Sequence, residues 1–300
     1  MEHLRRYAPL VDDPEAFLAA AAQPLPKVVW ANTVRCTAEE VAGWIGQRAP
    51  EAVRVPFLDA TWKLPAGSAR AGKWPEFALG LIHTQEEVSL WPVWALDPQP
   101  GEAVLDLCAA PGSKTARLAV TMGDRGQVVA NDRKWSRLQG VQDIASRMGL
   151  TSVVAVHGDG TQFPGEARFD RVLVDAPCTG EGTSRKSGGE GAPQRRREWH
   201  KLAQLQKGLL RRAVELTRPG GTIVYSTCTY APEENEAVLD AIYPEKAAIE
   251  PLTVPAGVTV APGVTEWEGS RFRPDVAHAI RFWPHLNDTG GFFVARLRRL

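Results

Sequence analysis

The chain lacks any long uninterrupted apolar run. Its 300 residues are 44% apolar, yet no stretch approaches the ~20 consecutive apolar residues that a membrane-spanning helix needs. The N-terminal sequence MEHLRRYAPLVDD also lacks the apolar core of a signal peptide. These absences predict a soluble, cytoplasmic protein that has no membrane as a partner.

Cysteine is scarce, and its four positions are Cys36, Cys108, Cys178 and Cys228. They lie far apart in the sequence and form neither a zinc spacing nor a disulfide framework. In a reducing compartment each should be a free thiol, and we expect no metal site. A free thiol is either catalytic or a small buried apolar group, and for Cys36 and Cys108 we favour burial.

Net charge is also missing, because 35 basic residues balance 35 acidic ones. No overall field would then draw the protein to nucleic acid, and any basic surface must be local. The candidate is the stretch from Ser184 to Lys201, which contains Arg185, Lys186 and the arginines at 195 to 197. These side chains either bind RNA phosphates or belong to a solvated loop that leads into a helix.

Both common phosphate-binding fingerprints are absent. The segment DLCAAPGSKT has no G-x-G-x-x-G pattern, and Ser113 separates Gly112 from Lys114, so it has no G-K-[ST] ending. Pro111 and Gly112 still permit a tight turn with exposed backbone N–H groups at the start of a helix. A pyrophosphate cradle is therefore less favoured than a site for a smaller zwitterion.

From residue 101 onward, short apolar runs alternate with helical patterns. This alternation predicts a doubly wound α/β domain with a mainly parallel seven-stranded sheet over residues 77–300. The last 22 residues predict a hairpin that closes one sheet edge, and the proline-rich stretch from Pro244 to Pro274 is expected to be irregular. Residues 1–76 predict a small α+β domain that binds RNA.

Acidic residues follow two of the predicted strands. Asp132 ends the second strand, where an acid commonly accepts the ribose hydroxyls of an adenosine ligand, and Asp159 ends the third, where it could accept an adenine amino group. A nucleoside without phosphates fits these carboxylates best, and S-adenosylmethionine is such a ligand. The alternative is that both residues only cap the next helix, because Asp is a favoured N-cap residue.

Two thiols follow the next pair of strands. The fourth strand ends in DAPC, with Asp175 and Cys178, and the fifth ends in STC, with Cys228. If the first, fourth and fifth strands lie side by side, as in methyltransferase-type sheets, both thiols overlook the cofactor pocket from neighbouring strand ends.

The motifs DLCAAPGSKT, VDAPCTGEGTSRK and STCTYAPEENE resemble three signatures of RNA cytosine-5 methyltransferases of the Sun family, especially its bacterial 16S ribosomal RNA branch (RsmF-like). Weaker family segments extend the resemblance over about residues 28 to 300. Two features depart from the pattern. Trp30 stands where the family usually has a basic residue, and the chain stops after the catalytic domain, without the C-terminal RNA-binding domain of longer bacterial relatives.

The resemblance implies a role for each matched residue. Cys228 corresponds to the nucleophile, Cys178 to the residue that helps to release the product, and Asp175 to the acid that faces the base. The implied cofactor-binding set comprises Cys108, Ala109, Ala110, Pro111, Gly112, Ser113, Lys114, Asp132, Arg137, Asp159 and Asp175. The implied substrate is RNA, with ribosomal RNA as first choice and transfer RNA as second, and nothing demands more than a monomer.

The chemistry explains why two thiols and a cation are needed. A thiolate that adds to carbon 6 of cytosine makes carbon 5 nucleophilic, and a base must later remove the carbon 5 proton. Lys114 is the cation best placed to favour the thiolate, and Asp175 can share a proton with the ring. Three alternatives stay open: a DNA cytosine-5 methyltransferase, whose nucleophile is the P-C cysteine, a catalytically silent RNA-binding assembly factor, and a small-molecule methyltransferase.

Overall fold

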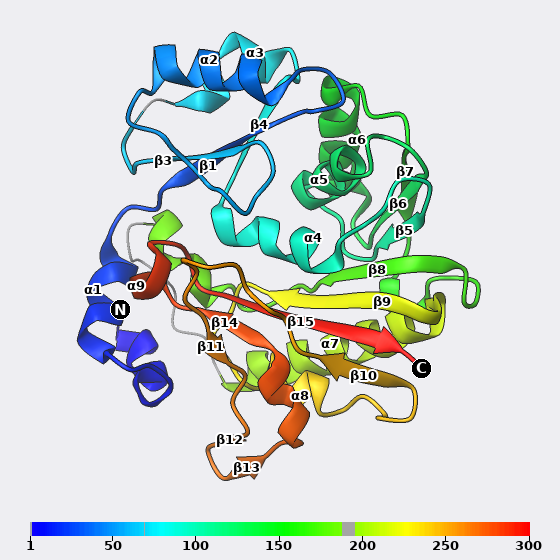
Figure 1. The fold of residues 1–300 in the computed structure, drawn as a ribbon. Helices are drawn as coiled ribbons and strands as arrows, with labels where there is room; N and C mark the ends of the chain where they lie inside the picture. The colour runs from blue at the N-terminus through cyan, green and yellow to red at the C-terminus, as the bar shows by residue number, and fades with distance from the viewer. Residues whose placement is uncertain (1, 69, 188–195) are drawn as a thin grey trace.

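The computed structural model describes residues 2–68, 70–187 and 196–300, and this part of the chain forms two sheets of unequal size (Figure 1). A separate two-stranded ribbon consists of β12 (Glu266–Trp267) and β13 (Ser270–Arg271). The 3-10 helices are η1 (Glu2–Leu10), η2 (Ala71–Lys73), η3 (Glu87–Leu90), η4 (Gly160–Gln162), η5 (Glu181–Ser187) and η6 (Pro274–His278). None of the helices in these ranges is long and apolar enough to cross a bilayer.

The smaller sheet is antiparallel throughout, with the order β2-β3-β1-β4. Its strands are β1 (Lys27–Ala31), β2 (Val53–Arg54), β3 (Thr61–Leu64) and β4 (Ile82–Gln85). Helix α2 (Ala38–Arg48) starts at a capping box, in which the Thr37 side chain accepts from Glu40 N and the Glu40 side chain accepts from Thr37 N. Val41 and Ile45 of α2 are buried in the core of this unit, near the short α3 (Pro75–Ala78). A strand, a helix and short strands therefore follow one another as the sequence predicted.

Two segments depart from a division of the chain at residue 76. Strand β4 lies beyond that position but pairs with β1, so the smaller sheet extends to Gln85. Residues 2–22 form η1 and α1 (Pro14–Ala22). They pack instead against the larger half of the protein, which contains the larger sheet, beside α9 (Pro284–Asn287) (Figure 1). The reason is apolar burial: Leu4, Tyr7, Phe17 and Ala21 share one cluster with Trp199, Tyr230, Trp267 and Trp283.

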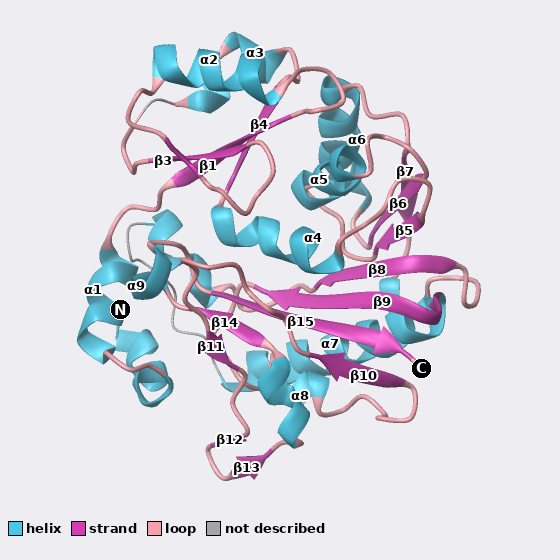
Figure 2. Ribbon diagram, in the orientation of Figure 1, coloured by secondary structure: helices cyan, strands magenta, loops and turns pink. Residues whose placement is uncertain are grey.

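The larger sheet has the order β11-β14-β15-β9-β8-β5-β6-β7, and β10 pairs with β15 (Figure 2). Five neighbours in this order run parallel to one another: β9, β8, β5, β6 and β7. The other pairings in the sheet are antiparallel. The expected seven strands are β5 (Ala103–Asp106), β6 (Gln127–Asp132), β7 (Val153–His157), β8 (Phe169–Asp175), β9 (Thr217–Thr227), β14 (Ile280–Phe282) and β15 (Phe292–Arg299). The sheet is extended by β10 (Ala247–Glu250) and β11 (Ala261–Pro262).

Helices cover both faces of this sheet. On one face pack α4 (Trp91–Leu96), α5 (Ser113–Thr121) and α6 (Trp135–Met148), and on the other α7 (Arg196–Leu216) and α8 (Glu236–Leu239). Alternate side chains of a strand point to opposite faces, so Val224 of β9 joins the first core while Ile223 and Tyr225 join the second. The predicted doubly wound α/β fold is confirmed.

The C-terminal hairpin is present but lies further inside the sheet than expected. β14 and β15 pair antiparallel, and β15 inserts between β14 and β9. The hairpin therefore extends the sheet, and β11 lies outside it. Between Pro244 and Pro274 the chain is mostly irregular, with four strands of two to four residues.

The order of the strands fixes where a ligand can bind. From β5 the chain moves outward through β6 to β7 and then returns to place β8 on the opposite side of β5. The direction of winding reverses between β5 and β8, and in such sheets ligands bind beyond the carboxyl ends of the strands at this point.

Candidate active site

The carboxyl ends of β5, β8 and β9 converge at the reversal point. Leu173 of β8 pairs with Asp106 of β5, and Asp175 of β8 pairs with Ser226 of β9. The three strands are neighbours, as expected, so the loops that carry Cys178 and Cys228 leave the sheet side by side.

The two thiols touch. Cys178 Sγ lies 3.4 Å from Cys228 Sγ, a hydrogen-bond distance for sulfur and much longer than a disulfide. All four cysteines are free. Cys178 and Cys228 both line one pocket of about 460 Å³, in agreement with the placement expected from the strand order.

The surroundings of the thiols favour a thiolate on Cys228. The hydrogen bond with Cys178 lowers the pKa of Cys228, against burial and the Asp175 carboxylate, and the Lys114 and Lys186 ammonium groups lower it further. The same contact, together with burial and the Glu234 carboxylate, raises the pKa of Cys178 well above its ordinary value. These directions favour Cys178 as the proton donor of the pair and a thiolate on Cys228, which is the nucleophilic form of a thiol.

Lys114 and Asp175 form an ion pair next to the thiols. Lys114 Nζ, in the first turn of α5, lies 2.7 Å from Asp175 Oδ2 at the end of β8. Ser226 Oγ donates to Asp175 Oδ1 at 2.8 Å. Burial alone would lower the pKa of Lys114, but the Asp175 carboxylate outweighs it and raises that pKa. Lys114 therefore stays charged close to Cys228, although the Asp175 carboxylate opposes its effect on the pKa of that thiol.

The loop between β5 and α5 is held in place by β6 and α6. Ala110 N donates to Asp132 Oδ2 at 3.2 Å, and Arg137 Nη2 donates to Ala110 O at 2.6 Å. Gly112, the N-cap of α5, has φ of 110°, and a Cβ there would lie 2.8 Å from Val141 Cα. Glycine is therefore required both for the left-handed conformation and for the close approach of α6.

The pocket continues from the thiols to the ends of β6 and β7. Its lining includes Leu107, Cys108, Pro111, Asp132, Arg133, Arg137 and Asp159, besides the thiols. A second pocket, of about 280 Å³, adjoins it and shares Cys108, Ala110, Pro111 and Asp175. Lys114 and Lys186 line only the second pocket. Asp175 thus stands between two hollows, one of which is bordered by the strand-end acids and the other by lysines.

The two strand-end acids differ in their local bonds. Asp159 caps η4, because its Oδ1 accepts from Thr161 N and Thr161 Oγ1. Asp132 caps no helix: α6 starts after Lys134, and Asp132 Oδ1 accepts from Lys134 N in the preceding turn. Of the two acids, Asp159 therefore caps a helix and Asp132 does not. The Asp159 side chain still borders the pocket.

The basic stretch requires a correction at Arg185. Its side chain is 3% exposed and donates to Gln23 O, Pro24 O and Thr289 O, besides an ion pair with Asp288. Because these partners occupy a buried guanidinium, Arg185 ties loops together and does not bind phosphate. Lys186 remains half-exposed and pairs with Glu86 at 2.6 Å. The side chains of Arg195 to Arg197 lie outside the described residues.

Sequence reasoning missed several polar partners of the site. Ser226 stands in the STC motif and donates to Asp175, and its place two residues before a strand-end cysteine could have drawn attention to it. Asp106 ends β5, is fully buried and accepts from Thr115 Oγ1 at 2.7 Å. Its other oxygen, Oδ1, has no hydrogen-bond partner among the residues that the structure describes. Only the packing of α5 on β5 reveals this arrangement.

Asp106 should make the stability of the protein depend on pH. Burial raises its pKa to about 7, whereas an unfolded Asp titrates near pH ~4. The folded state therefore keeps a proton that the unfolded state loses, so stability from this group is full below pH ~4 and falls as pH rises to ~7. The maximal slope is about 1.4 kcal/mol per pH unit for one proton.

Asp106→Asn should flatten this decline, as measured by urea unfolding across the range. The exposed Asp143 provides a matched control, and Asp143→Asn should leave the slope unchanged. An Asp106→Asn slope equal to that of the wild type would show that Asp106 is ionised in the folded protein.

Comparison with known proteins supplies a family. A protein-family model described as 16S rRNA methyltransferase RsmB/F matches residues 93–298. The chain is 34% identical over 299 residues to the tRNA (cytosine(49)-C(5))-methyltransferase of Pyrococcus abyssi, over 99% of this chain and 95% of that protein. It is 32% identical over 311 residues to Ribosomal RNA small subunit methyltransferase F of Erwinia tasmaniensis, over 100% of this chain and 63% of the relative.

A solved structure extends the similarity to the whole fold. The methyltransferase homolog protein from Pyrococcus horikoshii matches with a TM-score of 0.83 and 31% sequence identity. The match covers 100% of this chain and 99% of that one.

Proposed function

We propose, because this chain belongs to the 16S rRNA methyltransferase RsmB/F family, that it transfers a methyl group from S-adenosylmethionine to carbon 5 of a cytosine in RNA. The name of the Pyrococcus abyssi relative states that it methylates carbon 5 of a cytosine in tRNA, and the name of the Erwinia tasmaniensis relative gives the RNA of the small ribosomal subunit. The observation that carries the proposal is the thiol pair, with Cys228 and Cys178 3.4 Å apart beside the ion pair of Lys114 and Asp175.

The larger pocket suits S-adenosylmethionine. Its volume of about 460 Å³ lies in the range of small-molecule sites. Each oxygen of Asp132 accepts one backbone N–H and keeps a free lone pair for a ribose hydroxyl. Asp159 would face the adenine, and residues 108 to 114 the methionine portion. When bound there, S-adenosylmethionine supplies an activated methyl group.

Cys228 would begin the reaction on the base. Its thiolate forms a bond to carbon 6 of cytosine, and the electron pair of the 5,6 double bond is released toward carbon 5 and the ring nitrogen. The Lys114 ammonium, held against Asp175, stabilises the charge that develops on the ring and can share a proton with it. The same ammonium favours the attacking thiolate beforehand.

Cys178 would complete the reaction. In the free enzyme its hydrogen bond with Cys228 Sγ raises the pKa of Cys178. Once Cys228 sulfur is bonded to carbon 6 it is no longer an anion, and Cys178 can give its proton to solvent water more readily. The Cys178 thiolate then takes the carbon 5 proton, the 5,6 double bond forms again, and the electron pair of the S–C bond leaves with Cys228.

RNA is the proposed substrate, with ribosomal RNA first and transfer RNA second, since the relatives named above act on both classes. The test is transfer of a tritiated methyl group into RNA and into DNA, followed by mapping of the labelled base. The expected result is 5-methylcytosine in RNA alone. Label in DNA, in another atom of RNA, or in neither polymer would overturn the proposal.

Binding of the methyl donor provides a separate prediction. Asp132→Ala should weaken S-adenosylmethionine by at least about 1.5 kcal/mol, because hydrogen bonds to a charged group are lost. Isothermal calorimetry measures the change, and a thermal melt checks that the variant is folded. Asp143→Ala, on the exposed face of α6, is the matched control and should bind as the wild type does. Equal affinity of Asp132→Ala and wild type would leave Asp132 with a purely structural role.

A further inference from the structure

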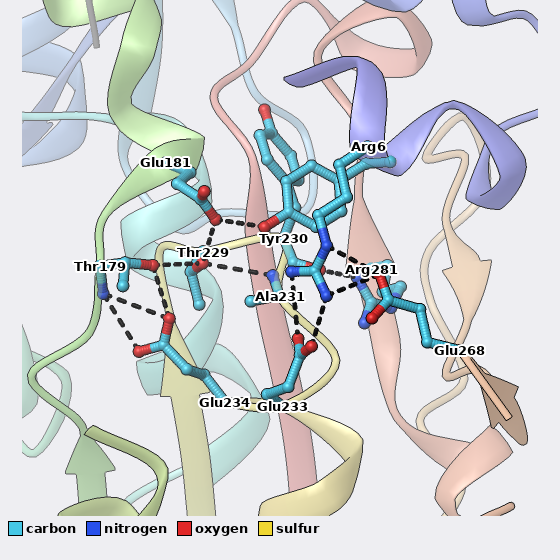
Figure 3. A network of polar contacts seen from close by, with 11 residues as sticks. Arg6, Thr179, Glu181, Thr229, Tyr230, Ala231, Glu233, Glu234, Glu268 and Arg281 are labelled. Atoms are coloured by element: carbon cyan, nitrogen blue, oxygen red, sulfur yellow. Dashed lines mark hydrogen bonds and ion pairs between the residues drawn. The ribbon is translucent and has the colours of Figure 1, made fainter. Parts of the chain in front are cut away.

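A hydrogen bond joins the residues that follow the two cysteines. Thr179 comes directly after Cys178, Thr229 directly after Cys228, and their Oγ1 atoms lie 2.9 Å apart (Figure 3). Gly182 N also donates to Cys228 O at 2.9 Å, so the same two loops share a backbone contact. The separation of the thiols is thus set by neighbours that bond to each other.

Each threonine hydroxyl also forms a hydrogen bond with a buried glutamate. Glu234 Oε1 lies 2.5 Å from Thr179 Oγ1, and Glu234 Oε2 accepts from Thr179 N at 3.1 Å and from Gln206 Nε2 at 2.8 Å. Glu181 Oε2 accepts from Thr229 Oγ1 at 3.1 Å. Glu234 is fully buried and Glu181 nearly so. Buried carboxylates are costly unless hydrogen-bonded, so these contacts constrain both loops.

The N-terminal segment joins the same network. Tyr7 OH donates to Glu181 Oε2 at 2.5 Å. The neighbouring Arg6 binds Glu233 at 2.5 Å and Glu268 at 3.0 Å (Figure 3). Its guanidinium also lies 3.9 Å from the ring centre of Trp199. The segment is therefore fastened to the loop that follows Cys228 by charge, hydrogen bonding and aromatic contact.

The hydroxyl groups of this network share too few hydrogens to complete every contact, so the contacts depend on one another. The chain from Glu234 through Thr179, Thr229 and Glu181 to Tyr7 has four contacts between oxygens but only three hydroxyl hydrogens. One proton on a glutamate completes all four. Burial raises the pKa of Glu234 to about 7 and also raises that of Glu181, so such a proton is available near neutral pH. Removal of any hydroxyl leaves its neighbours unsatisfied.

We propose that Thr179 and Thr229 are positioning residues, which hold the two thiols in reacting geometry, and that Tyr7 anchors them through Glu181. This inference rests on the proposed function, because it assigns the two thiols separate steps. Neither threonine lines either of the two pockets described above, so each acts through the cysteine that precedes it. Thr229 would govern attack by Cys228, and Thr179 would govern release through Cys178.

The test replaces each hydroxyl by a methyl group of nearly the same shape. Thr229→Val should slow formation of the covalent RNA adduct about tenfold or more, and Thr179→Val should slow its release by a similar factor, with RNA affinity unchanged. Single-turnover kinetics on denaturing gels separate the two steps. Thr229→Ser and Thr179→Ser keep the hydroxyl and should restore rates to within about threefold of the wild type.

The controls separate positioning from stability. Thr183 lies in the same segment, but within the described part of the chain its hydroxyl donates to Gly180 O and is outside the network, so Thr183→Val should behave as the wild type. Tyr7→Phe leaves both loops unchanged in sequence and should slow adduct formation about threefold or more, whereas Tyr243→Phe, at an exposed tyrosine, should not.

Valine variants that attack and release at wild-type rates, or serine variants as slow as valine, would overturn the inference. If the valine variants do not fold, the Tyr7→Phe rate decides, and an unchanged rate refutes the role of the network. A wild-type protein that never methylates RNA would instead refute the proposed function.

Discussion

Replacement of Cys228 by serine is expected to abolish both RNA methylation and the covalent enzyme–RNA complex. A serine hydroxyl is far less nucleophilic than a thiolate. It also stays protonated near neutral pH even beside Cys178, Lys114 and Lys186, the groups that lower the pKa of Cys228. Loss of a covalent nucleophile commonly costs about a thousandfold or more in rate. Methyl transfer and denaturing gel electrophoresis measure the two effects.

The matched control is Cys36→Ser. Cys36 is buried in the smaller half of the protein, where its thiol lies 3.2 Å from Leu81 O, a contact that a hydroxyl can keep. That variant should methylate RNA at nearly the wild-type rate. A covalent complex formed by Cys228→Ser would contradict the assignment and leave Cys228 as a structural thiol at the end of β9.

Replacement of Cys178 by serine is expected to give the opposite gel result. Attack by Cys228 and methyl transfer should still occur, since neither step requires a base at position 178. The carbon 5 proton should then leave slowly, because a serine hydroxyl ionises much less readily than the thiol. A methylated adduct should accumulate and survive denaturing electrophoresis.

The two serine variants together identify the mechanism. A DNA-type enzyme, in which the P-C cysteine attacks, predicts no adduct with Cys178→Ser and an adduct with Cys228→Ser. Because the two sulfur atoms lie only 3.4 Å apart, their positions alone do not assign their roles, and the two gel results do so. Slow reaction of both variants without any adduct would exclude a covalent mechanism at either cysteine.

Much of the site could be predicted because its residues follow strands. Asp132, Asp175 and Cys228 each lie at or just beyond the end of a strand that an apolar run marks in the sequence. Carboxyl ends of parallel strands share one edge of the sheet, so such residues converge whatever the details of packing. The loop from Cys108 to Lys114 was located by the same reasoning.

Arg185 shows where that reasoning stops. Its position in a basic stretch beside a catalytic motif suggested contact with phosphate, but its partners are carbonyl groups of residues 23, 24 and 289. These lie more than 100 positions away in the sequence. A charged residue has the same local pattern whether it faces solvent or fastens loops together, so its role cannot be read from its neighbours.

The sequence by itself determined the alternation of strands and helices, the glycine turn after β5 and the two thiols at strand ends, because periodicity and turn chemistry are local properties of the chain. Only the tertiary structure decided that Lys114 pairs with Asp175 and that residues 2–22 pack on the larger half. It alone joined Tyr7 to Glu181 across 174 positions. Such contacts depend on how whole elements pack, and that packing is set by the sum of many weak apolar contacts rather than by any single motif.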